Sequence, residues 1–291
     1  MRLDAGRPHL PAHRSVCELL LLLAHLPDAS VVDPSLRNIR SLDLSGLGLT
    51  DLPPEIGALS GLHTLNLADN QLSTLPAEIG QLRELYGLIV WGNRLAALPA
   101  EIGQLSRLGV LYAWDNQLTA LPAEIGQLKL LEDLNISGNR IAFLPPEIGG
   151  LRSLVWINLW DNRLSELPAE LGQLSRLQTL RIAGNAIRQL PDEIGRLHCL
   201  EWLDAPDNAL TELPDSVGQL RQLEGLLLSG NSLTDLPASM AGMPRLRRVD
   251  LNENQLRSVP AVAGDLPALR ELWMESSLSD RVSLRWPRGG S

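Results

Sequence analysis

The sequence predicts an α/β solenoid, a curved right-handed superhelix with a parallel β-sheet on its concave side and short helical or 3-10 turns on its convex side. Two observations predict this architecture. Segments of similar sequence recur every 23 residues without insertion. Each segment begins with alternating apolar and polar residues, as in a half-buried strand, and ends in a stretch with Pro and Gly that suits a short turn. The residues that open the segments are Ile39, Leu62, Leu85, Leu108, Leu131, Leu154, Leu177, Leu200, Leu223, Leu246 and Leu269.

Each 23-residue unit is numbered here from its opening residue, and positions 1, 4, 6, 11, 14, 18 and 21 are apolar in almost every unit. In the second unit these positions hold Leu62, Leu65, Leu67, Leu72, Leu75, Ile79 and Leu82. Positions 3 to 7 predict a short half-buried strand. One unit cannot bury its apolar face alone, so stacked units must share one continuous core.

Position 9 is asparagine in nine consecutive units, where the chain must turn sharply after the strand. An amide side chain both donates and accepts hydrogen bonds, so stacked asparagines can satisfy the backbone groups of adjacent buried turns. Leu47 and Ser277 stand at this position in the terminal units, so the ladder is expected to stop there. The predicted ladder comprises Asn70, Asn93, Asn116, Asn139, Asn162, Asn185, Asn208, Asn231 and Asn254.

The second half of each unit predicts a short helical turn. Pro76 and its equivalents suit the first turn, because proline fixes φ near the helical value. Glu78 and its equivalents lie near the start of the turn, where a negative charge is favourable. We expect Gly80 and its equivalents to end the turn with a positive φ.

The repeat LxxLxLxxNxLxxLPxEIGxLxx resembles the 23-residue leucine-rich repeats of Shoc-type Ras-pathway scaffolds. It is also similar to those of plant intracellular Ras-group proteins and of many bacterial leucine-rich-repeat proteins. The resemblance extends over residues 39–274, which is most of the chain. It implies a protein-interaction module that binds through its concave sheet, since the family shares a scaffold and no single ligand.

The two ends of the chain are expected to cap the stack. Residues 1–38 predict an N-terminal helical cap, with a helix over residues 16–26, because Ser15 and Glu18 form a capping box ahead of an apolar run. A secretory signal peptide is the alternative for this segment. Residues 39–268 hold ten repeats, and residues 269–291 hold a partial repeat, a C-terminal cap and a tail. Within that cap, residues 282–286 alternate like a strand, so Trp286 is expected to cover the far edge.

Composition narrows the class of partner. The formal net charge of −9 and the pI of about 5.1 disfavour nucleic acid. No apolar run reaches the length of a membrane span, so no membrane association is expected. The two cysteines, Cys17 and Cys199, are far apart, which favours a reducing compartment and hence the cytoplasm, with a secreted effector as the alternative. The excess of arginine over lysine favours a bacterial source, and we expect a monomer.

Aromatic residues gather at the positions that should face the concave side, namely positions 3, 5 and 7 with the flanking position 2. Eight of the ten aromatic residues stand there. Tryptophan and tyrosine are enriched at binding hot spots, so this pattern predicts a site for a protein partner. The alternative is that the rings pack on one another and only stiffen the sheet. The eight are Tyr86, Trp91, Tyr112, Trp114, Trp156, Trp160, Trp202 and Trp273. The predicted site extends from Tyr86 to Trp160 and on toward Trp202, and it does not include Trp273.

Position 8 alternates between glycine and an acidic residue from Gly46 to Glu253, which suggests duplication of a two-repeat unit. Asp115 and Asp161 belong to this stripe and lie beside the tryptophans, so we include both in the predicted partner site. The acids should be roughly 10 Å apart, too far for two of them to share one Ca²⁺ ion. The stripe could attract a basic partner segment or an arginine that stacks on tryptophan, or it could consist simply of solvated turn residues.

Other functions are less well supported. The aromatic face also fits a glycan, with Asn135 and Asn158 able to hold hydroxyl groups, and the chain could be the recognition part of a larger bacterial effector or signalling protein.

We expect no enzymatic activity, no cofactor and no metal, because no phosphate loop, paired-carboxylate cleft or zinc spacing occurs. His9 and His13 are separated by Pro11, and the pair His198 and Cys199 is expected to be buried or half-buried and structural.

Overall fold

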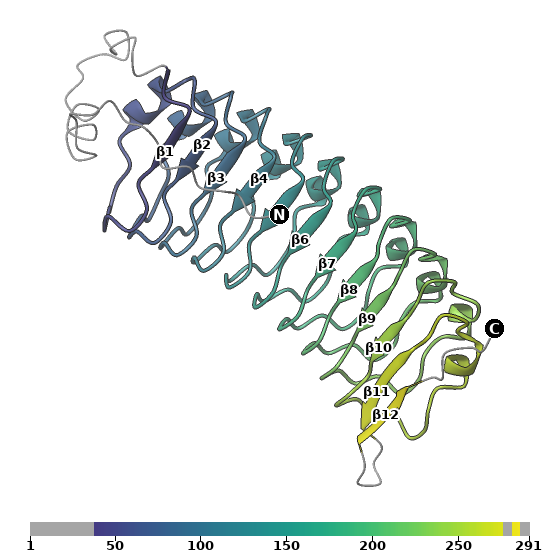
Figure 1. Cartoon of the computed structure of the whole chain (residues 1–291). Helices are drawn as coiled ribbons and strands as arrows, with labels where there is room; N and C mark the ends of the chain where they lie inside the picture. The colour runs from purple at the N-terminus through teal and green to yellow at the C-terminus, as the bar shows by residue number, and fades with distance from the viewer. Residues whose placement is uncertain (1–37, 276–280, 286–291) are drawn as a thin grey trace.

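A computed structural model describes residues 38–275 and 281–285 of the chain. These residues form one open sheet of twelve strands, β1 to β12, whose spatial order is their order in the sequence (Figure 1). The N-terminal helix expected over residues 16–26, the ladder end at Ser277, and Trp286 lie outside the described residues.

The strands are short and in register. Those from β1 to β11 run parallel, and each residue pairs with the residue 23 positions later, as Leu42 does with Leu65. The predicted strand at positions 3 to 7 is shorter in β1 to β10, covering positions 3 to 5, whereas β11 covers positions 3 to 7. Inter-strand bonding nevertheless continues beyond it, since the Asp69 N–H donates to the Trp91 carbonyl at 3.0 Å. The strands are β1 Ser41–Asp43, β2 Thr64–Asn66, β3 Gly87–Ile89, β4 Val110–Tyr112, β5 Asp133–Asn135, β6 Trp156–Asn158, β7 Thr179–Arg181, β8 Trp202–Asp204, β9 Gly225–Leu227, β10 Arg248–Asp250, β11 Glu271–Glu275 and β12 Arg281–Arg285.

The last strand differs from the rest. β12 pairs antiparallel with β11, with Trp273 opposite Ser283. The chain therefore folds back on itself after the final repeat, and β12 covers the edge that β11 would otherwise leave unpaired.

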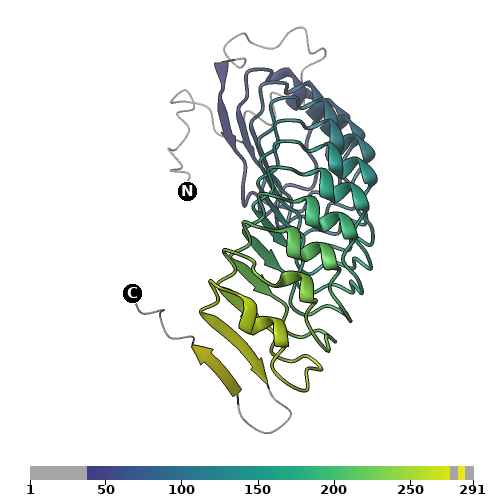
Figure 2. The same ribbon diagram turned by 90° about the vertical axis from the view of Figure 1, so that its right-hand side faces the viewer.

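Short 3-10 helices line the side of the solenoid opposite the sheet, and the sheet lies on the concave side (Figure 2). Proline precedes each helix as its N-cap, as Pro76 does with φ −68° and ψ 150°, so it lies one residue before the first turn where it was expected. Glu78 lies in the first turn, as predicted. The helices are η3 Pro54–Ala58, η4 Ala77–Gln81, η5 Ala100–Gln104, η6 Ala123–Gln127, η7 Pro146–Gly150, η8 Ala169–Gln173, η9 Asp192–Arg196, η10 Asp215–Gln219, η11 Ala238–Met240 and η12 Ala261–Asp265.

The glycine inside each 3-10 helix has a role different from the predicted one. The expectation of a positive φ at Gly80 and its equivalents is wrong, because none of these glycines adopts one. A Cβ atom at Gly80 would instead lie 2.7 Å from the carbonyl oxygen of Glu101 in the next helix. Consecutive helices thus stack too closely for a side chain, and glycine is required by space.

The core consists of the apolar repeat positions, whose side chains are almost all fully buried. The position-9 asparagines run beside it and tie each unit to its neighbour. Asn116 is typical: its Oδ1 accepts from the Leu95 N–H at 3.0 Å, and its Nδ2 donates to the carbonyls of Val90 at 3.0 Å and Ala113 at 3.2 Å. Each asparagine therefore satisfies buried backbone groups in its own and the preceding unit.

Candidate interaction site on the concave face

The concave face is formed by positions 3, 5 and 7, while positions 4 and 6 point into the core. In β2 and β7, for example, the central residue is buried and its two neighbours are half-exposed. The seven aromatic side chains of the predicted site and Trp273 are all at least partly accessible, and Tyr86 is the most exposed at 48%. We call these eight side chains, from Tyr86 to Trp273, the concave aromatic surface.

Two of the tryptophans stack on each other. The rings of Trp91 and Trp114 have centroids 4.4 Å apart and an interplanar angle of 9°. Both stand at position 7, and consecutive repeats bring them face to face. The rings thus pack mutually, as the alternative interpretation expected, and both remain partly accessible.

Glycines in the sheet give two other rings room to lie flat. A Cβ atom at Gly109 would collide with the ring of Tyr86, and one at Gly225 would collide with the ring of Trp202. Each glycine stands at the same repeat position as the aromatic residue, one unit later. The role of these glycines was not predicted, although a glycine in a strand often marks such a close approach.

Arginines, which the sequence analysis also missed, cover three of the tryptophans. The guanidinium carbon of Arg181 lies 5.0 Å from the ring centroid of Trp160 and 5.9 Å from that of Trp156. Its Nε is 3.5 Å from Oδ2 of Asp204, whose pKa is raised by burial, with Arg181 acting in the opposite direction. The 23-residue register was the available signal, because Arg181 pairs with Asn158 on one side and Asp204 on the other.

The second arginine site lies near the C-terminal end of the sheet. The guanidinium carbon of Arg248 is 5.9 Å from the ring centroid of Trp202, and its Nε is 3.0 Å from Oε2 of Glu271. These residues line a pocket of about 240 Å³ with Glu224, Arg247 and Arg270. Trp202 is therefore held in a charged environment, unlike the stacked pair Trp91 and Trp114.

A polar strip separates the aromatic residues of β4 from those of β6. It consists of Asp133 and Asn135 in β5, followed by Ser137. Burial raises the pKa of Asp133, and the neighbouring Glu132 raises it further. Asn135 uses its Oδ1 to accept from the backbone N–H and the hydroxyl of Ser137, at 3.2 and 2.8 Å.

The acidic stripe at position 8 has a conformational role. Asp115 and Asp161 are exposed and have φ values of +50° and +51°, in the left-handed region that aspartate tolerates better than most residues. The glycines that alternate with the acids have positive φ as well. A Cβ atom at Gly92 would lie 2.7 Å from Oδ1 of Asp69, and the other three aspartates of the stripe likewise lean over the glycine of the next unit.

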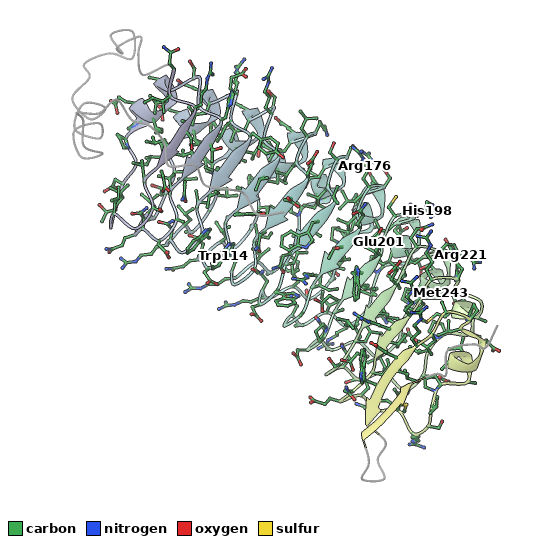
Figure 3. The ribbon with its side chains drawn as sticks, in the orientation of Figure 1. Trp114, Arg176, His198, Glu201, Arg221 and Met243 are labelled. Atoms are coloured by element: carbon green, nitrogen blue, oxygen red, sulfur yellow. The ribbon has the colours of Figure 1, made fainter. Side chains whose placement is uncertain are left out.

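His198 and Cys199 do not form a buried structural pair. Both are exposed, which contradicts the expectation, because positions 22 and 23 face outward before the strand begins. Figure 3 shows His198 on the side of the solenoid that carries the 3-10 helices and Trp114 toward the opposite side. Within the described part of the chain, no three His, Cys, Asp or Glu side chains gather as a metal site would require. No helix there is long and apolar enough to cross a bilayer.

Comparisons with known protein families identify the type of repeat. A leucine-rich repeat region model matches residues 34–119, and leucine-rich repeat models match residues 130–151, 152–210, 206–256 and 221–278. No curated protein sequence matches significantly.

Solved structures agree with these matches. A leucine-rich-repeat protein of Leptospira interrogans is 33% identical with a TM-score of 0.69, over 85% of this chain and 70% of that one. A TDR receptor is 30% identical with a TM-score of 0.65, over 81% and 47%. The functional domain of InlJ from Listeria monocytogenes, described as including a cysteine ladder, is 25% identical with a TM-score of 0.60, over 82% and 54%. The chain thus spans about half of the last two structures. With most of its length matched by repeat models and with the Leptospira protein as a relative, the chain belongs to the leucine-rich-repeat proteins.

Proposed function

We propose that the chain is a non-enzymatic recognition module that binds a protein partner through the concave aromatic surface. The observation that carries the proposal is the placement of eight partly accessible aromatic side chains on one face of the sheet. Tryptophan and tyrosine bury a large area on binding and lose little conformational entropy, so they dominate protein interfaces. The similarity to a TDR receptor supports a recognition role.

The aromatic side chains are already held in place. Trp91 and Trp114 stack, Arg181 covers Trp156 and Trp160, and Tyr86 lies flat over Gly109. A surface that is ordered before binding loses less entropy when a partner docks. This rigidity favours recognition of a defined surface or segment.

Trp160 gives independent support for a role beyond folding. Its indole N–H is buried and has no hydrogen-bond acceptor among the described residues. An unsatisfied buried donor costs stability, typically about 1–3 kcal/mol. The fold alone would be better served by a smaller apolar residue there, so the indole ring favours a functional use.

The glycan alternative has weaker support. Asn158 uses its Oδ1 to accept from the backbone N–H of Trp160 at 3.1 Å, and Asn135 Oδ1 accepts from the Ser137 hydroxyl at 2.8 Å. The amide oxygens proposed to hold sugar hydroxyls therefore already have partners.

We also propose a monomer in the cytoplasm. The free, exposed thiol of Cys199 is compatible with a reducing compartment.

The proposal is tested by selecting binders from a displayed peptide library with the whole chain as bait. The selected peptides are then measured against a Trp114→Ala/Trp160→Ala variant and against Phe143→Ala as a matched control. Phe143 is 62% exposed but lies outside the strands, so its loss removes a surface aromatic without touching the site. Circular dichroism verifies that all the proteins are folded.

We expect the double variant to lose at least about tenfold in affinity, since each hot-spot aromatic typically contributes more than about 1 kcal/mol. Phe143→Ala should bind like the unaltered protein. Binders that tolerate the double variant would refute the role of the concave aromatic surface. A library without binders, combined with glycan-array hits that require Trp114 and Trp160, would favour the glycan alternative.

A further inference from the structure

The concave face contains two places where the chain inserts its own arginine between an aromatic ring and an acid. In the first, Arg181 of β7 lies between Trp156 and Trp160 of the preceding unit and Asp204 of the following strand. The ring attracts the cation through its π face, and the carboxylate neutralises the charge. Aromatic, arginine and acid thus follow one another across neighbouring strands.

The second place has the same order of aromatic residue, arginine and acid, with a glycine between the aromatic residue and the arginine. The ring of Trp202 lies flat over Gly225 of β9, Arg248 of β10 comes next, and Glu271 of β11 holds the guanidinium at 3.0 Å. The register confirms the sequence of contacts, since Gly225 pairs with Trp202 on one side and Arg248 on the other. Both places therefore satisfy a guanidinium with a ring and a carboxylate.

Over β5 the acids and the tyrosines have no arginine between them, and of the rings there Arg181 approaches only Trp156, on the β6 side, at 5.9 Å. Tyr112 of β4 and Trp156 of β6 flank Asp133 and Asn135, and Tyr86 lies over Gly109, which precedes Glu132 by one repeat. The four units from Leu85 to Arg176 carry four acids and no Lys, Arg or His at positions 2, 3, 5, 7 and 8. We call the side chains of Tyr86, Tyr112, Glu132, Asp133 and Trp156 the β5 trough.

The two carboxylates of the β5 trough have no partner within residues 38–275, neither an ion pair nor a hydrogen bond. Together with burial, their negative charge raises the pKa of the two neighbouring tyrosines. Burial raises the pKa of Tyr112, and Asp133 raises it further; the pKa of Tyr86 is raised by burial and then by Glu132 and Asp133. Unpaired negative charge between aromatic rings attracts a cation strongly.

We infer that the β5 trough binds an arginine side chain of the partner, with its guanidinium against Tyr112 and Trp156 and paired with Asp133 and Glu132. This inference rests on the proposed function and specifies the chemistry of the partner. Arginine fits better than lysine, because its planar, weakly hydrated guanidinium both stacks on rings and pairs with carboxylates. The chain itself uses arginine at both comparable places.

The test uses the tripeptide Ac-Gly-Arg-Gly-NH₂ as the probe and the whole chain labelled with ¹⁵N at its tryptophan indoles. Peptides with lysine or citrulline in place of arginine are the matched controls, and citrulline keeps the planar shape without the charge. Indole N–H signals of Trp156 and Trp114 are assigned by substitution and followed by NMR at millimolar peptide. We expect the arginine peptide to shift the Trp156 signal and the citrulline peptide to bind at least about fivefold more weakly, since about 1 kcal/mol corresponds to that factor.

Substitutions locate the site. Asp133→Asn and Glu132→Gln should each weaken the arginine peptide by about threefold or more. Asp43→Asn removes the same charge at position 5 of β1, at the far end of the sheet, and should leave the affinity unchanged. Asp133→Asn removes an unpaired, half-buried charge, so it is expected to fold at least as well as the unaltered chain.

The inference would be overturned by an arginine peptide that shifts no indole signal, by equal binding of arginine and citrulline, or by full affinity in Asp133→Asn. The proposed function would survive any of these results if library-selected peptides still required Trp114 and Trp160. If those peptides also ignored the tryptophans, the proposed function itself would fall.

Discussion

The convex and concave sides of this solenoid obey different constraints. On the convex side, Gly80 and its equivalents recur because the next 3-10 helix leaves no space for a side chain. On the concave side, position 5 changes from Asn66 to Tyr112 to Arg181 while the strands keep the same register. The identity of a residue that projects between units is fixed by stacking, whereas residues that project out of the sheet are free to differ from unit to unit. The solenoid therefore separates residues that build the fold from residues whose identity the fold leaves open.

The largest expected effect comes from the asparagine ladder, which belongs to the first class. Asn116→Ala removes the acceptor of the Leu95 N–H and the donor to the carbonyls of Val90 and Ala113. We expect a loss of roughly 2–4 kcal/mol in the free energy of unfolding, because several buried backbone groups lose their partners. Urea denaturation measures it.

The control for this prediction is a concave asparagine. Asn66→Ala removes one hydrogen bond, in which Asn66 Oδ1 accepts from the Ala68 N–H at 3.1 Å, at a half-exposed site. Its expected loss is about 0.5–1.5 kcal/mol. Equal losses for Asn116→Ala and Asn66→Ala would break the proposed division between the two classes of residue.

The next effect is steric and compares two glycines at the same repeat position. Gly80→Ala would place a Cβ atom 2.7 Å from the Glu101 carbonyl oxygen, whereas Gly264→Ala in η12 meets nothing within 4 Å. We expect Gly80→Ala to lower the free energy of unfolding by about 1–3 kcal/mol, as overpacking does. Gly264→Ala should be neutral or slightly stabilising. Similar losses at both sites, measured by thermal unfolding, would show that conformation and not stacking requires the glycine.

The fold could be predicted from the sequence because stacked units require the same types of residue at the same position of every repeat. The 23-residue spacing fixed which residues pair across strands, and the apolar positions identified the core. Asn116 and the other ladder residues were identifiable because an amide at every turn matches the hydrogen-bonding groups that a turn exposes. These features depend on position within one unit, which the sequence states directly.

Features that depend on the distance between units were not predictable in the same way. The role of Gly80 was misjudged because the spacing of adjacent 3-10 helices does not appear in the sequence. Arg181 was overlooked because its long side chain reaches back to the preceding unit and forward to Asp204, and the side-chain torsions that decide this are not encoded by periodicity. His198 and Cys199 were expected to be structural because no carboxylate or pocket accompanies them in the sequence, and their exposure follows from the outward direction of positions 22 and 23.

A smaller effect is expected at the arginine site on the concave face. Arg181→Ala leaves the carboxylate of Asp204, whose residue is 7% exposed, without its ion-pair partner. The Arg181 side chain is 39% exposed, so solvent screening limits the expected loss to about 1 kcal/mol. The double variant Arg181→Ala/Asp204→Asn should recover part of that loss, because the buried charge is gone. No recovery in the double variant would show that Arg181 stabilises by covering the tryptophans and not by pairing.

The smallest effect has the opposite sign and probes the β5 trough. Burial and Glu132 raise the pKa of Asp133 above its unfolded value of about 3.9. A carboxyl group with a raised pKa in the folded state destabilises the fold as the pH rises through the window between the two values, and the penalty persists at neutral pH. Asp133→Asn should therefore raise the melting temperature at pH 7, and this gain should vanish below about pH 4, where the carboxyl is protonated in both states.

Asp43→Asn is the control for Asp133→Asn, because its carboxylate accepts hydrogen bonds from the Ser45 N–H at 3.0 Å and the Ser45 hydroxyl at 2.6 Å. Removing that charge should not stabilise the protein. A gain at Asp133 alone would mean that the chain carries an acid where an amide would fold better. Such a residue is explained by a cation that pairs with it in the complex, as Arg181 pairs with Asp204 within the chain. If Asp133→Asn instead melts below the unaltered protein at pH 7, the carboxylate supports the fold and that explanation fails.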